Sequence, residues 1–237
     1  IYSFHDYNLF RTASFAGLNN YKKILSDPLI MKAFVQTFKY AFLTVPLELI
    51  FALFIAYILN FKIKGVNFFR TAYYIPSILG GSVSIAVLWR FLFKTEGLVN
   101  MIASRFGIQP FNWLGDPGGA FWVIVFLKIW QFGSPMVIFL AALKGVSKDL
   151  YEAASIDGAG KWRQFFSVTI PLITPVIFYN LITQLCQAFQ EFNGPFLVTK
   201  GGPNGATTLI SVLIYNNAFL RHKMGMASAQ AWVLFII

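Results

Sequence analysis

Long apolar segments are the feature of this sequence that most constrains its fold. Of the 237 residues, 57% are hydrophobic and only 12% are charged, whereas a soluble globular domain carries about 25% charged residues. So little charge cannot cover a surface that faces water, while a lipid bilayer accepts apolar surface. The sequence therefore predicts an all-α fold, a polytopic bundle of membrane helices.

Five segments are long and apolar enough to cross, or nearly cross, the hydrocarbon core, which needs about 20 residues of helix. Proline or glycine interrupts the first four of them. No segment between them has the size of a soluble domain, so residues 1–237 are interpreted as a single transmembrane domain. The expected spans cover residues 33–59, 72–93, 121–143, 170–192 and 226–237.

The density of Lys and Arg in the loops predicts which loops face the cytoplasm. Loops 60–71 and 144–166 together hold seven of these residues in 35 positions, while residues 1–32, 94–119 and 193–225 hold nine in 91. We expect the denser pair to be cytoplasmic, so that the five spans start outside and end inside. The first residues then lie outside, and we expect one more span upstream of them.

Composition also argues against several classes of protein. The formal net charge is +10, but the basic residues are spread between apolar segments, which favours membrane loops over a nucleic-acid site. The sequence contains no Gly-x-Ser-x-Gly, His-Glu-x-x-His or phosphate-binding glycine motif, so we expect no catalytic residue and no enzyme activity. A single cysteine and two isolated histidines offer neither a disulfide nor a metal site.

The loop before the fourth expected span has the pattern of a short helix followed by a sharp turn. Ser147 is a plausible N-cap, and Asp149 and Glu152 favour the positive end of a helix. Gly158 and Gly160 then stop the helix and permit a left-handed turn. This pattern predicts a helix that lies across the cytoplasmic face and presents side chains to a docking partner.

The same loop carries a resemblance to a known family. Glu152-Ala153-Ala154, Asp157-Gly158-Ala159, Phe166 and Ile170-Pro171 resemble the EAA signature of ABC importer permeases. Segments along essentially the whole chain, among them Trp113–Pro117 and Thr199–Pro203, are similar to permeases of the MalF/UgpA type, which import carbohydrates. The resemblance implies a type I importer permease fold with six spans in its core. It also implies a coupling loop at 144–169, with ATPase-coupling residues Tyr151, Glu152, Ala153, Ala154, Asp157, Gly158 and Ala159.

The resemblance also implies partners. They are a second homologous permease, two copies of a cytoplasmic ATPase, an extracytoplasmic solute-binding protein and a carbohydrate substrate, in the lipid bilayer of a bacterial cytoplasmic (inner) membrane. No partner is a nucleic acid. The chain itself binds no cofactor, since the ATPase uses ATP and Mg. The implied function is import of a carbohydrate, an oligosaccharide, by alternating access. A sugar phosphate or peptide permease and a secondary transporter remain the alternatives.

The fourth expected span carries a stripe of polar side chains. Asn180, Gln184, Gln187 and Glu191 stand at i, i+4, i+7 and i+11, on one face of a helix. We interpret the stripe as a polar wall of the substrate pathway, because amides and carboxylates match sugar hydroxyls. The alternative is that these groups hydrogen-bond to neighbouring helices and hold the bundle together. In the resembled family, this stripe and the part of the third span at Gln131 and Phe132 line the sugar pocket.

Lys128 is a charge deep inside an expected span, where an ionisable side chain needs a partner or a cavity. An ion pair with Glu48 or Glu191 is the favoured interpretation. The alternative is a counter-charge for an acidic saccharide or a sugar phosphate, which includes Lys128 among the substrate-binding residues. On that alternative, Lys128→Met would selectively reduce uptake of an anionic substrate.

Overall fold

The structure, a computed structural model, describes residues 1–8, 10, 12–61 and 64–237. It confirms the all-α fold, since helices account for most of the described chain and the strands β1 and β2 are two residues each. Lys62, one of the basic residues of the 60–71 loop, lies outside the described residues.

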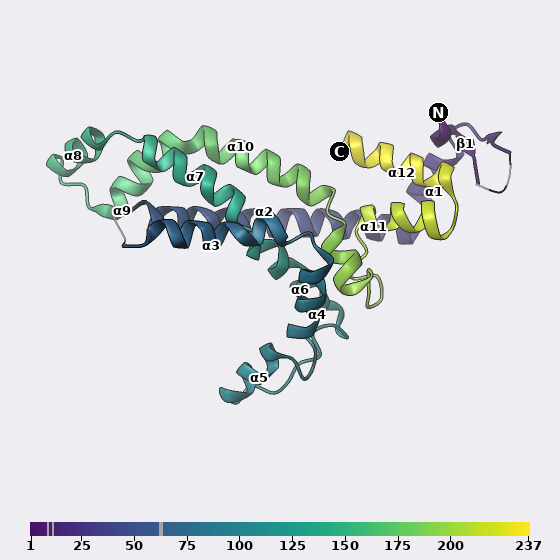
Figure 1. Cartoon of the computed structure of the whole chain (residues 1–237). Coiled ribbons are helices and arrows are strands. Elements are labelled where there is room, and N and C mark those ends of the chain that lie inside the picture. The colour runs from purple at the N-terminus through teal and green to yellow at the C-terminus, as the bar shows by residue number, and fades with distance from the viewer. Residues whose placement is uncertain (9, 11, 62–63) are drawn as a thin grey trace. The chain divides into compact units, whose positions relative to one another are not determined.

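Contacts divide the chain into two compact units. Unit 1 comprises residues 1–42, 81–127 and 187–237, and unit 2 comprises residues 43–80 and 128–186. Figure 1 labels most of the elements. In chain order the elements are η1 (Tyr2–Phe4), β1 (His5–Asp6), β2 (Ser14–Phe15), α1 (Asn19–Ser26), α2 (Pro28–Asn60), α3 (Val66–Leu79), α4 (Val83–Leu92), α5 (Leu98–Arg105), α6 (Pro117–Trp130), α7 (Gly133–Gly145), α8 (Lys148–Ile156), α9 (Lys161–Gln164), η2 (Phe165–Thr169), α10 (Ile170–Phe189), η3 (Pro195–Thr199), α11 (Ile210–Tyr215), η4 (Asn216–Leu220) and α12 (Met224–Ile236).

Helix α2 is the longest element, with 33 residues. It starts where the sequence favours a start, because the Asp27 carboxylate accepts a hydrogen bond from the Leu29 N–H at 2.8 Å and Pro28 occupies the first helical position. Pro46 lies inside it, and proline is tolerated in a membrane helix because neighbouring groups satisfy the freed backbone carbonyl. Among the described residues, α2 and the continuous segment Lys161–Phe189 are long and apolar enough to cross a bilayer unaided.

The expected second and third spans are each two helices rather than one. Residues 72–93 divide into α3 and α4 at Gly80-Gly81-Ser82, where the Ser82 hydroxyl caps α4 by accepting the Ile85 N–H at 3.3 Å. Residues 121–143 divide into α6 and α7 next to Gly133. Counting each pair as one span gives up to four long spans among the described residues, and α12 is a shorter apolar helix.

Helices α3 and α7 pack directly against each other in unit 2 (Figure 1). The Ser77 hydroxyl donates to the Gln131 carbonyl at 2.7 Å and accepts the Ser134 N–H at 2.9 Å. A Cβ atom on Gly133 would lie 2.8 Å from the Tyr74 Cα and closer still to the Tyr73 carbonyl oxygen. Glycine at 133 is therefore required by the close approach of the two helices.

Gly133→Leu should destabilise unit 2 by about 3 kcal/mol, because the new side chain forces the α3 backbone away from α7. Thermal unfolding of the purified protein in detergent measures the effect. Gly145→Leu is the matched control, because Gly145 ends the same helix with open space around its Cβ position. An equal unfolding midpoint for the two variants would contradict the packing argument.

Unit 1 has its own apolar core. It gathers α1, α2, α11 and α12 around Ile24, Ile30, Ala33, Phe34, Ile210, Leu213 and Ala229. The Thr37 hydroxyl accepts the Ile210 N–H at 2.9 Å, which satisfies the first turn of α11. The Trp89 indole donates to the Val123 carbonyl at 3.0 Å and links α4 to α6.

Candidate functional site: an exposed helical loop and a buried ion pair

Helix α8 forms in the loop where the sequence predicts a short helix. The Ser147 hydroxyl accepts the Asp149 N–H at 3.2 Å and confirms the predicted N-cap. No residue of α8 is buried, and the Ile156 side chain is 87% exposed. An apolar side chain this exposed, next to carboxylates, is suited to a protein partner.

Gly158 ends α8 as the sequence predicts, with φ at +76° in the left-handed region. A Cβ atom at this position would meet nothing within 4 Å, so the backbone conformation alone requires glycine here. Gly160 differs from its expected role, because it has an extended conformation and forms the N-cap of α9. The turn between α8 and α9 thus depends on a single left-handed residue.

Side chains outside the EAA-like residues hold this loop in shape. The Tyr151 hydroxyl lies 2.8 Å from the Thr169 hydroxyl, which ties α8 to η2. The Gln164 amide donates to the Ser155 hydroxyl at 2.8 Å and to the Ala159 carbonyl at 2.9 Å. Sequence reasoning missed Gln164 and Thr169, because their partners are set by the turn at Gly158 rather than by any periodic pattern.

The structure therefore places the predicted coupling residues together on α8 and the turn that follows it, in unit 2 (Figure 1). Of these coupling residues, Ala154 and Ala159 are half-buried. Four are exposed: Glu152, Ala153, Asp157 and Gly158. This division into an anchored and an exposed face is what a docking helix needs. The assignment of these residues to coupling stays a prediction.

Lys128 forms the buried ion pair that the sequence favoured, with Glu48 as its partner. The Lys128 Nζ lies 3.5 Å from Glu48 Oε2 and donates to Gln184 Oε1 at 3.1 Å. Glu48 is fully buried and Lys128 is 6% exposed. The three side chains come from α2, α6 and α10, so the pair joins three helices within unit 2.

The polar stripe of α10 is shorter than predicted. Asn180 and Gln184 are buried in unit 2, whereas Gln187, in unit 1, is exposed. The helix ends at Phe189, so Glu191 lies beyond it. The Glu191 carboxylate instead accepts the Gly194 N–H at 2.9 Å, at the start of the next helical turn, which helps to explain why the helix ends early.

Asn180 is the most unusual member of the stripe. Its side chain is 0% exposed, and neither its amide nitrogen nor its oxygen has a hydrogen-bond partner among the described residues. A buried, unsatisfied amide is costly. Gln184, one turn along the helix, is hydrogen-bonded to Lys128. Of these two buried amides, therefore, one has a hydrogen-bond partner and the other does not.

Gln131 and Phe132 lie at the break between α6 and α7. The Phe132 ring is buried. It packs edge-on against Phe51, with the ring centroids 4.7 Å apart, and at a tilt against Tyr73, with the centroids 5.8 Å apart. The Gln131 carbonyl accepts the Ser77 hydroxyl. The Phe132 side chain is thus part of helix packing in this conformation, while Gln131 takes part through its backbone carbonyl. The role of both residues in binding stays a prediction. Among the described residues, no group of three or more His, Cys, Asp or Glu could hold a metal ion.

Long apolar helices, one of them with an internal proline, and a short exposed helix between them are features of a multi-pass membrane protein. The model of the family described as "Binding-protein-dependent transport system inner membrane component" matches residues 28–237, and the chain belongs to this family.

Curated relatives agree with this assignment. The "Probable ABC transporter permease protein YesP" of Bacillus subtilis is 43% identical over 239 residues, which cover 99% of this chain and 77% of the relative. The "Trehalose/maltose transport system permease protein MalF" of Thermococcus litoralis is 38% identical, covering 94% of this chain and 76% of the relative. The "sn-glycerol-3-phosphate transport system permease protein UgpA" of Escherichia coli is 34% identical, covering 95% and 77%. The predicted resemblance to permeases of the MalF/UgpA type is confirmed.

A solved structure supports the fold. The crystal structure of a bacterial ABC transporter involved in the import of the acidic polysaccharide alginate matches with a TM-score of 0.81. The match covers 93% of this chain and 80% of that one, at 24% identity. The all-α importer permease fold expected from the sequence is therefore confirmed.

Proposed function

We propose that the chain is the membrane-spanning permease subunit of an ATP-driven, binding-protein-dependent importer that moves an oligosaccharide into the cytoplasm. The observation that carries the proposal is helix α8, anchored to unit 2 by Tyr151 and Gln164 and exposed on its other side. Membership of the family supports the permease role. The names of relatives support the substrate class, since they include transport systems for trehalose and maltose, for starch degradation products and for multiple sugars.

The proposed importer complex contains a second homologous permease, two copies of a cytoplasmic ATPase and an extracytoplasmic solute-binding protein, in a bacterial cytoplasmic membrane. The ATPase subunits bind ATP and Mg, and this chain contributes no catalytic group. Closure of the ATPases moves α8, and the contacts of Tyr151 and Gln164 carry that movement into α9 and η2, which continue into α10. The spans then alternate between outward and inward access.

An anionic substrate is the second candidate. It is supported by the relative named for sn-glycerol-3-phosphate and by the fold neighbour involved in alginate import. The Lys128–Glu48 pair favours a neutral sugar instead, because the Lys128 charge already has a buried carboxylate beside it. The substrate-binding role of Asn180, Gln184, Gln187 and Glu191 remains part of the proposal.

Uptake by reconstituted proteoliposomes tests the function. The chain would be co-expressed with its neighbouring permease, ATPase and binding-protein genes and offered a panel of neutral and acidic oligosaccharides and sugar phosphates. We expect uptake of a neutral oligosaccharide that requires both ATP and the binding protein. ATP hydrolysis without uptake of any saccharide would refute the sugar assignment, and failure of any ATPase to join the complex would refute the importer.

A further inference from the structure

An apolar groove of about 500 Å³ opens on unit 2, and neither Lys128 nor Glu48 lines it. One wall is α2, which contributes Ile50, Phe54 and Ile58, all exposed. The other wall is α9 and η2, which contribute Trp162 and Phe166, 77% and 62% exposed. Exposed apolar side chains are ordinary on a span that faces lipid. These residues differ because they line one concave groove, and concave apolar clefts are where ligands bind.

The floor of the groove is fixed by aromatic packing. Tyr57 and Phe165 meet with ring centroids 4.8 Å apart, which joins α2 to η2. Phe165 lies edge-on to Phe166 at 5.2 Å, and Trp162 stacks on Phe166 at 6.4 Å. The groove is therefore formed by side chains already in contact, and filling it requires no opening of the helices.

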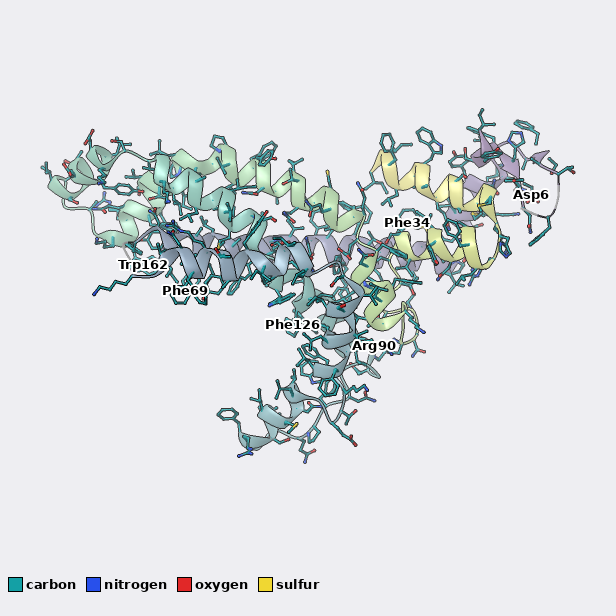
Figure 2. The ribbon with its side chains drawn as sticks, in the orientation of Figure 1. Asp6, Phe34, Phe69, Arg90, Phe126 and Trp162 are labelled. Carbon is teal, nitrogen blue, oxygen red and sulfur yellow. The ribbon has the colours of Figure 1, made fainter. Side chains whose placement is uncertain are left out.

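Among the described residues, Lys161 is the one charged residue that lines the groove. It is exposed, and its ammonium has no ion-pair partner among the described residues. Figure 2 places the neighbouring Trp162 at the end of the bundle of unit 2 where α9 lies. The groove thus has an apolar body within the span, and the charge in its described lining, Lys161, lies at the end of the span, where lipid headgroups lie.

The dimensions match half a bilayer. From Ile50 to Ile58 is eight residues, about 12 Å along a helix that rises about 1.5 Å per residue. One leaflet of the hydrocarbon core is about 15 Å deep. Because α2 ends at Asn60, two residues after Ile58, the groove runs inward from the membrane surface to near the middle of the bilayer.

We propose that the groove binds an anionic phospholipid, with an acyl chain against Phe54, Trp162 and Phe166 and the phosphate beside Lys161. An acyl chain is the occupant that an apolar slot at bilayer depth accepts, and basic pockets at the cytoplasmic ends of membrane helices attract anionic headgroups. The site lies on α9 and η2, which follow α8 within the loop at 144–169. The bound lipid thus stabilises the junction through which the proposed docking helix acts, whatever substrate the protein carries.

Fluorescence quenching tests the proposal. The full chain, purified from membranes with the subunits that accompany it, would be placed in vesicles of phosphatidylcholine containing increasing fractions of brominated phosphatidylglycerol or brominated phosphatidylcholine. The difference between the native protein and Trp162→Phe isolates the Trp162 signal. We expect brominated phosphatidylglycerol to quench Trp162 at an about fivefold lower mole fraction than brominated phosphatidylcholine, the preference that one lysine gives near an anionic lipid.

Lys161→Gln should abolish that preference, while Lys148→Gln, in the same loop but outside the groove, should keep it. Quenching by neither lipid would mean that a protein segment covers the groove, and would overturn the proposal. Equal quenching of the native protein by the two lipids would show plain bilayer contact, and equal losses in the two lysine variants would show general surface charge. Either result would also overturn the proposal. Sugar uptake is measured separately, so failure of the lipid site leaves the proposed function untouched.

Discussion

Lys128→Met should destabilise the folded protein by about 3 kcal/mol or more and sharply reduce the amount recovered from membranes. The substitution leaves the Glu48 carboxylate, which is fully buried, without its ammonium partner. Removing one member of a buried ion pair costs more than the pair itself contributes, because the remaining charge is uncompensated. Thermal unfolding in detergent and the yield of monodisperse protein measure the loss.

The double variant Glu48→Gln with Lys128→Met should recover most of the stability, since it removes both charges together. Lys39→Met is the matched control, because Lys39 lies in α2 but is exposed, and its ammonium makes a cation–π contact 4.6 Å from the centre of the Phe121 ring. That contact contributes about 0.5–1 kcal/mol. If Lys128→Met were as stable as Lys39→Met, the ion pair would not be structural.

The stable double variant also separates the two interpretations of Lys128. If the charge serves the substrate, uptake of anionic saccharides should fall in the double variant while uptake of neutral ones persists. If the charge serves the fold, both should be carried equally well. We expect the second result, because Lys128 already has Glu48 and Gln184 as partners.

The sequence predicts the features that depend on local chemistry. The low charge and long apolar segments predict the membrane helices, and Ser147 and Gly158 predict where α8 starts and ends. These signals work because a cap or a left-handed turn needs particular residue types whatever surrounds them. The same loop carries the EAA-like part of the family resemblance, so local pattern and family agree there.

Features that depend on distant neighbours were harder to predict. The polar stripe assumed a helix that continues past Phe189, but the Glu191 carboxylate accepts the Gly194 N–H instead. Helical spacing placed Gln187 with Gln184, yet one is exposed and the other buried, because burial depends on which helices pack nearby. The partner of Lys128 was left open between two carboxylates for the same reason.

Gly158→Arg should abolish ATP-driven uptake while leaving membrane insertion intact. The backbone at Gly158 has φ +76°, a conformation that costs an L-residue about 1–2 kcal/mol. The turn it forms sets the Gln164 bond to the Ala159 carbonyl and hence the orientation of α8. A long cationic side chain would also project from the exposed face that is proposed to dock on the ATPase. Uptake and ATPase activity would be measured in the same proteoliposomes.

Two matched variants separate the contribution of backbone strain to the loss of uptake from that of the bulky side chain. Gly158→Ala introduces the backbone strain without the bulk, so it should reduce uptake only in part. Gly145→Arg introduces the same side chain at the end of α7, where the Cβ position is open and φ is not positive, so uptake should stay near the native rate. Stimulation of the ATPase by the binding protein should be lost in Gly158→Arg and kept in Gly145→Arg. Native uptake in Gly158→Arg would exclude this turn from the docking surface, and α8 would then be only a connection between spans.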